Sequence, residues 1–88
     1  MTKKTLIINQ YKILNESIKS LSEQKERMLN KAMNASSLAV SAKTTEVARR
    51  HKLDEFNANL ERECIEAKLT VIEEKLKLLT NELINQAV

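Results

Sequence analysis

The sequence predicts an all-α fold, a long antiparallel helical hairpin similar to a coiled coil. The chain of 88 residues contains no Gly and no Pro, the residues on which the tight turns of β folds depend. It is rich in Leu, Lys, Glu and Ala, which favour helices. Its apolar residues recur at alternating steps of four and three, the spacing of packed helices. We therefore expect a single helical domain over residues 1–88.

A first apolar stripe predicts a helix over about residues 5–41. Its only charged member is Lys25, and it ends in alanines rather than in larger side chains. A stripe at this spacing indicates packing against another helix rather than a ligand site. The stripe consists of Ile7, Tyr11, Leu14, Ile18, Leu21, Lys25, Met28, Ala32, Ala35, Ala39 and Ala42.

A second stripe predicts a helix over about residues 45–86. It consists of Ile65, Leu69, Ile72, Leu76, Leu79 and Leu83. Upstream of it, Leu53, Phe56, Leu60 and Cys64 keep a helical spacing with one extra residue in the count. We therefore expect a local shift of the stripe around residues 60–65. We also expect Cys64 to be a buried, unreactive thiol on this apolar face.

The two stripes face each other if the chain reverses near residue 43. Residues in contact then have numbers that add to roughly 86, and this places apolar residues opposite apolar residues. The facing pairs are Ile7 with Leu79, Tyr11 with Leu76, Leu14 with Ile72, Ile18 with Leu69, and Leu21 with Ile65. The exceptional Lys25 falls opposite Glu61, and we expect these two side chains to pair.

The charges of the two halves agree with this pairing. Residues 1–52 contain eleven Lys or Arg and four Glu, a net charge of +7, whereas residues 53–88 contain four Lys or Arg and eight Asp or Glu, a net charge of −4. Halves of opposite charge attract each other when they lie side by side. The same register brings three further pairs together: Lys4 with Glu82, Lys12 with Glu74, and Lys31 with Glu55.

The turn is expected in "SAKTT", residues 41–45. Ser41 or a threonine can cap a new helix, and adjacent β-branched residues weaken an existing one. A reversal at "NASS", residues 34–37, would instead place Leu21 opposite Arg50 and leave residues 68–88 without a partner. We allow only a kink there.

Two other arrangements stay open. Lys43, Arg49, Arg50 and Lys52 would lie near the start of the second helix, where the helix dipole disfavours cations. The chain can avoid this conflict as one continuous helix that pairs antiparallel with a second copy, which gives the same facing residues as the hairpin. The other arrangement has three helices.

One pair of helices does not use all of the apolar surface. The surplus residues, which we expect to form a partner or dimer interface, are Leu6, Ile13, Val71, Leu78, Ile84 and Val88. Self-association into a homodimeric four-helix bundle would bury them. A groove that accepts an amphipathic helix of another protein would do the same.

No group of residues predicts catalysis, a cofactor or a metal site. His51 is the only histidine, and with Glu55 it gives too few ligands for a catalytic metal. There is no glycine-rich phosphate loop. A basic cluster is the one candidate for binding an anionic partner, and it consists of Lys43, Arg49, Arg50, His51 and Lys52. Such a cluster is compatible with nucleic acid, although Glu46, Asp54 and Glu55 dilute it.

We therefore expect a non-enzymatic protein–protein interaction module, a small helical chaperone, adaptor or regulator that binds its partner through helix packing. The alternative is a basic helical-bundle protein that binds nucleic acid. In architecture alone the expected hairpin is similar to Rop-type RNA-binding dimers and to secretion-system chaperones, with no motif in "MTKKTLIINQYKILNES" or elsewhere that assigns it to either. No apolar run approaches the length of a membrane span, so we expect a cytoplasmic protein that does not enter a membrane.

Overall fold

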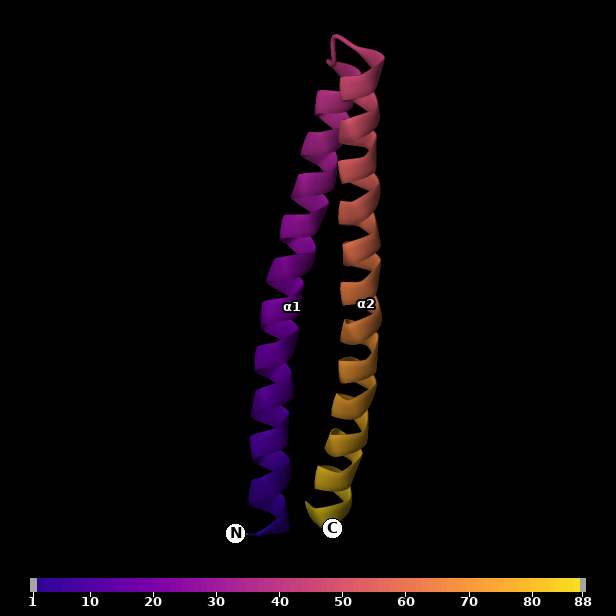
Figure 1. The fold of residues 1–88 in the computed structure, drawn as a ribbon. Coiled ribbons are helices and arrows are strands. Elements are labelled where there is room, and N and C mark those ends of the chain that lie inside the picture. The colour runs from indigo at the N-terminus through magenta and orange to yellow at the C-terminus, as the bar shows by residue number, and fades with distance from the viewer. Residues whose placement is uncertain (1, 88) are drawn as a thin grey trace.

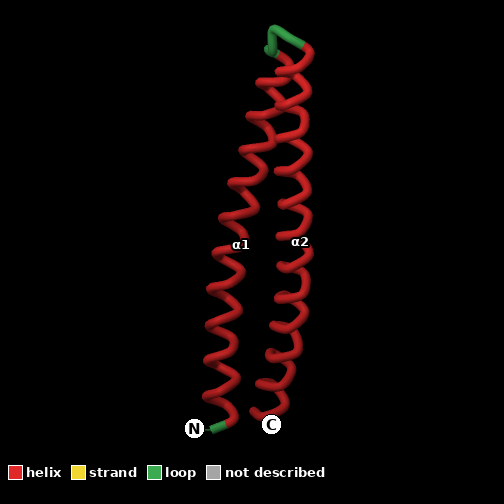
Figure 2. The backbone as a smooth tube through the Cα atoms, in the orientation of Figure 1, coloured by secondary structure: helices red, strands yellow, loops and turns green. Residues whose placement is uncertain are grey.

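The chain folds as two long helices packed antiparallel along their whole length (Figure 1). The computed structural model describes the backbone of residues 2–87 and the side chains of residues 2–85. Helix α1 spans Lys3–Val40 and helix α2 spans Thr45–Ala87. The molecule measures 66 × 16 × 14 Å, and its two termini lie at the same end (Figure 1). The described residues contain only helix and a short connection (Figure 2), which confirms the hairpin and excludes the continuous helix and the three-helix arrangement.

Side-chain hydroxyls define both ends of α1. The Thr2 hydroxyl accepts a hydrogen bond from the Thr5 N–H at 3.2 Å, which satisfies one of the donors left free at a helix N-terminus. At the other end, the Ser41 hydroxyl donates to the Ser37 carbonyl at 3.2 Å. The helix runs unbroken through residues 34–37, so the alternative turn segment does not interrupt it.

The turn between the helices occupies residues 41–44, as predicted, and it needs no glycine. No non-glycine residue of the described chain has a positive φ, and Ser41 has φ −88° and ψ 0°. Thr44 then caps α2, because its hydroxyl accepts the Val47 N–H at 3.2 Å and its carbonyl accepts the Ala48 N–H at 3.0 Å. Glu46 lies in the first turn of α2, where a negative charge complements the helix dipole.

The two predicted stripes form the seam between the helices. Ile7, Ala32, Ala35 and Ala39 of α1 and Ile65 of α2 are buried. The other predicted seam residues are half-buried, as expected for a pair of helices that covers its seam from only two sides: Tyr11, Leu14, Ile18, Leu21, Lys25 and Met28 of α1, Ala42 of the turn, and Leu69, Ile72, Leu76, Leu79 and Leu83 of α2.

The predicted shift of the α2 stripe is wrong. The seam continues from Ile65 toward the turn with the same alternating steps, through Arg62, Ala58, Glu55, His51 and Ala48, which are buried or half-buried. An unbroken α-helix advances its contact face steadily, so it cannot rotate a different face inward without an insertion or a distortion. The large apolar residues upstream are therefore exposed instead of packed, and the prediction of a buried Cys64 is also wrong, since its side chain is exposed.

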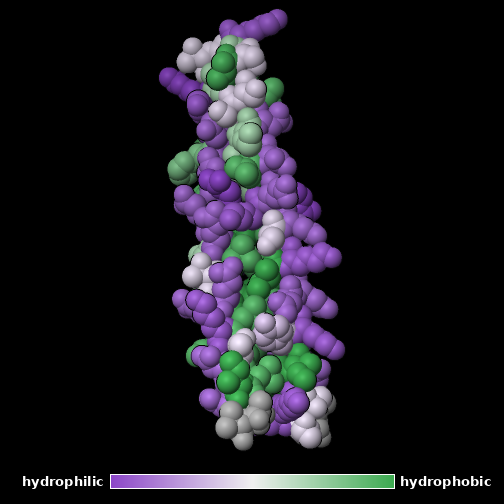
Figure 3. Space-filling model, turned by 180° about the vertical axis from the view of Figure 1, so that it is seen from behind, coloured by the Kyte–Doolittle hydropathy of each residue, from purple (hydrophilic) through white to green (hydrophobic). Residues whose placement is uncertain are grey.

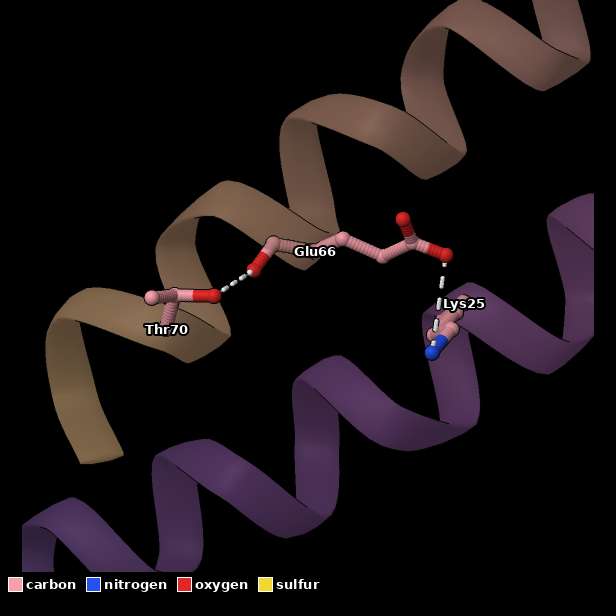
Figure 4. Close-up of polar contacts among 3 residues, drawn as sticks. All are labelled: Lys25, Glu66 and Thr70. Atoms are coloured by element: carbon pink, nitrogen blue, oxygen red, sulfur yellow. Dashed lines mark hydrogen bonds and ion pairs between the residues drawn. The ribbon is translucent and has the colours of Figure 1, made fainter.

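The pairing of Lys25 with Glu61 is wrong as well. Lys25 Nζ lies 3.5 Å from Glu66 Oε1 (Figure 4), with the two side chains 43% and 45% exposed, while Glu61 is exposed. The Thr70 hydroxyl donates to the Glu66 carbonyl at 3.1 Å. Because Arg62, another cation, occupies the neighbouring seam position on α2, Lys25 reaches a carboxylate one turn farther along. Within residues 2–85 this is the only ion pair that joins the two helices.

The seam changes character along its length. Near the turn it is made largely of alanines, which allow two helices to approach closely, and the two ribbons lie together there in Figure 1. Toward the termini Leu and Ile replace alanine, and the ribbons are farther apart. Seen from behind, a largely apolar band, interrupted by side chains of intermediate hydropathy, is visible between hydrophilic flanks in this half (Figure 3). The apolar seam of the terminal half is thus partly open to solvent.

Candidate interaction surfaces

A shallow groove runs between the helices in the half of the hairpin that holds the termini. It consists of two adjoining hollows, and we call it the terminal groove. The hollow nearer the termini is lined by Gln10, Ile13, Leu14, Lys75, Leu78 and Leu79. The next is lined by Ser17, Ser20, Leu21, Ala67, Lys68, Val71 and Ile72.

The two hollows repeat with the period of the seam. Gln10, Ile13 and Leu14 in the first are replaced in the second by Ser17, Ser20 and Leu21, each seven residues later. The lining residues of α2 shift by seven in the opposite direction, as antiparallel helices require. Seven residues of helix span about 10 Å, so side chains spaced seven apart on another helix would match both hollows.

The rim of the terminal groove is charged on one side only. Lys68 and Lys75 line it from α2, whereas Gln10, Ser17 and Ser20 line it from α1. The floor is formed by Leu and Ile side chains of the seam. An occupant of this groove would therefore be apolar along its centre and acidic along the edge that faces α2.

The structure brings together only part of the predicted interface. Ile13, Val71 and Leu78 line the terminal groove, and Leu6 lies one heptad before Ile13 on the same line of α1, exposed. Ile84 is exposed too, but six residues of helix place it about 120° around α2 from Leu78, so it is separate from the groove. Val88 lies outside the described residues.

Sequence reasoning missed a second apolar surface on α2, which faces away from the seam near the turn and reaches the wall of the terminal groove at Ala67, Val71 and Leu78. We call it the outer stripe. Its members are Leu53, Phe56, Leu60, Cys64, Ala67, Val71 and Leu78, all exposed. At 100° per residue these seven side chains lie within about 40° of one line along the helix, on nearly the opposite side from the seam near the turn. The signal was present in the sequence, because the seam spacing extends from Ile65 through Arg62 and Ala58 and leaves these residues as a separate series.

The predicted basic cluster does not form one patch. Residues 49–52 follow one another on α2, so their side chains point in four directions around the helix. His51 is half-buried at a seam position, and Lys52 Nζ lies 3.4 Å from Glu55 Oε2. Lys43 is in the turn. A phosphate backbone would meet scattered cations here rather than a continuous stripe.

The described part of the chain has neither a metal-binding cluster nor a membrane-spanning helix. No group of three or more His, Cys, Asp or Glu side chains is close enough to hold a metal ion there. Neither α1 nor α2 combines the length and the apolar character needed to cross a membrane.

No protein-family model, curated protein or solved structure matches the chain.

Proposed function

We propose that this protein is a non-enzymatic interaction module, an adaptor or small chaperone, that binds an amphipathic helix of another protein in the terminal groove. The observation that carries the proposal is the repeat of two apolar hollows at the heptad spacing between α1 and α2. Helix-in-groove recognition uses anchors at this kind of spacing. Such a helix would add a third member to the hairpin and cover its half-open seam.

The chemistry of the partner helix follows from the lining of the groove. Two large aliphatic side chains seven residues apart would enter the hollows beside Ile13 and Val71. Glu or Asp residues along one edge would lie near Lys68 and Lys75. Burial of each large aliphatic side chain contributes roughly 1.5 to 3 kcal/mol, so the apolar anchors supply most of the affinity and the charges select the orientation.

The nucleic-acid alternative has less support. The cations of the basic cluster point in different directions, and one of them is already paired with Glu55. Phosphate binding gains from cations that follow a common line. Nucleic-acid binding and homodimerisation through the terminal groove are the two other results that the test below can reveal.

The test uses a synthetic amphipathic helix as the probe, with Leu at heptad spacing and Glu along one edge, together with a second peptide that has Lys in place of Glu. The full-length protein should bind the acidic peptide more tightly, and its affinity for that peptide should fall as salt rises. The variant Ile13→Glu should lose binding. Met33→Glu is a matched control, because Met33 is 63% exposed and Ile13 is 62% exposed on the same helix, but Met33 is outside the groove.

The same variants extend the test to the native partner. A protein captured from cell extract by the wild type should be retained after nuclease treatment, be lost with Ile13→Glu, and be kept with Met33→Glu. Capture that depends on nucleic acid would favour the alternative function. Equal peptide binding by wild type and Ile13→Glu would overturn the proposed groove.

A further inference from the structure

The outer stripe of α2 is an apolar surface that nothing within the hairpin covers. Its five large members are 49% to 66% exposed, and the stripe extends over 26 residues, about 38 Å of helix. Glu74 interrupts the stripe between Val71 and Leu78, because it lies five full turns after Phe56 on the same line of the helix. An apolar stripe of this length on a helix is typical of a site where another helix packs. Its own sequence indicates which helix that is.

Six of the seven members of the stripe form a palindrome, and the seventh, Phe56, falls opposite Lys75. Leu53 and Leu78, Leu60 and Val71, and Cys64 and Ala67 are three pairs of residues whose numbers each add to 131. If a second copy of α2 packs antiparallel on the first, with a two-fold axis between residues 65 and 66, each of these residues faces its counterpart in the other copy. The smallest side chains then lie nearest the axis, where two helices can approach most closely.

The flanks of the stripe support the same pairing. In a symmetric antiparallel pair of helices, one flank of the stripe contacts the same flank of the second copy. The charges within that flank must therefore be complementary to one another. Along one flank Arg50 lies near Glu82 of the second copy, and Glu61 lies near Lys68 of the second copy. The numbers of these pairs add to 132 and 129, so they are offset by one or two residues from the facing positions, and symmetry repeats each pair. The other flank brings one like-charged pair close, Lys52 with Lys77, but Lys52 is held 3.4 Å from Glu55 of its own helix.

We infer that the outer stripe of α2 binds a second copy of this chain, antiparallel and two-fold symmetric, with α1 on the outside of the dimer. This interface is separate from Ile13 and from the floor of the terminal groove. It does cover Ala67, Val71 and Leu78, which line the α2 side of the groove. Dimerisation and capture of a partner helix therefore share one wall and depend on different residues elsewhere.

Sedimentation equilibrium of the full-length protein over a range of concentrations tests whether the dimer uses this surface. Wild type should show a reversible monomer–dimer equilibrium. Leu60→Glu should weaken dimerisation by at least about tenfold and keep the helicity measured by circular dichroism, since Leu60 is exposed in the hairpin. Ile13→Glu should leave the dimer intact while it abolishes binding of the acidic peptide, so the two proposals fail separately. A monomeric wild type, or a dimer broken by Ile13→Glu and kept by Leu60→Glu, would overturn the inference.

A charge exchange tests the register. Arg50 and Glu82 are separated by about 48 Å along α2 of one copy and cannot pair within it. Arg50→Glu alone and Glu82→Arg alone should each weaken dimerisation, by up to about fivefold per pair, and the double variant should recover part of the loss. Additive losses in the double variant would contradict the proposed register.

Cross-linking tests the orientation. Two variants are mixed in equal amounts, one with Leu53→Cys and Cys64→Ala, the other with Leu78→Cys and Cys64→Ala, and treated with a short bismaleimide. The antiparallel dimer should give the mixed product, because Leu53 of one copy faces Leu78 of the other. Each variant alone should remain uncross-linked. Self-linked products of either variant, or an absence of the mixed product, would refute the antiparallel arrangement.

Discussion

The turn half and the terminal half of the hairpin use their seams in different ways. Ala32, Ala35, Ala39 and Ala58 are almost fully buried near the turn, but an alanine has little apolar area to withdraw from water. In the terminal half Leu and Ile dominate, and most of them are only half-buried. The turn half thus achieves close contact with little apolar surface, whereas the terminal half has abundant apolar surface that two helices alone cannot cover.

The two halves therefore contribute differently to the stability and the geometry of the hairpin. Apolar stabilisation scales with the area buried, so most of it comes from the terminal half, even with a half-open seam. The turn half also places Arg62 in the seam, where its Nε is buried and lacks a hydrogen-bond partner among the described residues, which costs free energy. The close alanine contacts fix how the helices lie, and the open seam beyond them forms the terminal groove.

The largest expected loss of stability from a seam substitution is at Ile65, the buried residue of the α2 stripe. Ile65→Ala should lower the free energy of unfolding by about 2 to 5 kcal/mol, because it removes buried methyl groups and leaves a cavity. Chemical denaturation followed by circular dichroism measures this. The half-buried Leu21 is a useful comparison, since Leu21→Ala should cost less. A loss at Ile65 no greater than at Leu21 would contradict the ranking by burial.

Enlarging an alanine tests the close approach in the turn half. Ala35→Leu should destabilise the hairpin by about 1 to 3 kcal/mol, because the extra atoms force the helices apart. The matched control is Asn34→Leu, which introduces the same side chain one residue earlier at an exposed position and should be nearly neutral. If both variants are equally stable, the alanines do not set the helix separation.

The cap of α2 tests how the turn ends without glycine. Thr44→Ala removes the hydroxyl that accepts the Val47 N–H and should cost about 1 kcal/mol. Thr44→Ser keeps a capping oxygen and should restore most of the stability. Equal melting temperatures for Thr44→Ala and the wild type would show that another group caps the helix.

The smallest expected effect concerns the ion pair between the helices. A double-mutant cycle on Lys25 and Glu66 should give a coupling of about 0.2 to 1 kcal/mol at low salt, typical of an exposed pair. The same cycle on Lys25 and Glu61 should give none, since Glu61 is not the partner. Stronger coupling to Glu61 would restore the pairing predicted from the sequence.

The sequence was sufficient for the helices, the turn and most of the seam. Heptad spacing from Ile7 and from Ile65 identified the buried faces, and the opposite charges of the two halves agreed with the reversal near residue 43. The α2 segment before Ile65 could not be assigned by hydrophobicity, since its largest apolar residues are not those that face α1. Continuity of the helix decides the contact face there, and it places Glu55, His51 and Arg62 inward.

The candidate surfaces were predicted less completely. Ile13, Val71 and Leu78 were recognised as surplus apolar residues, and they line the terminal groove. The outer stripe was hidden because Leu53, Phe56 and Leu60 had been assigned to the seam. Lys68 and Lys75 were hidden as well, because one sequence does not show which of many lysines borders a groove.

Methyl-selective NMR of the full-length protein tests most directly that the hairpin offers two apolar surfaces to two different partners. On dilution, the methyl signals of Leu53, Leu60, Val71 and Leu78 should shift as the dimer dissociates, while those of Ile13 and Leu14 stay in place. Addition of the acidic amphipathic peptide should shift Ile13, Leu14 and Leu21 and leave Leu53 unchanged. Shifts of Ile13 and Leu14 on dilution, or one common set of shifts in both titrations, would contradict the two-surface account.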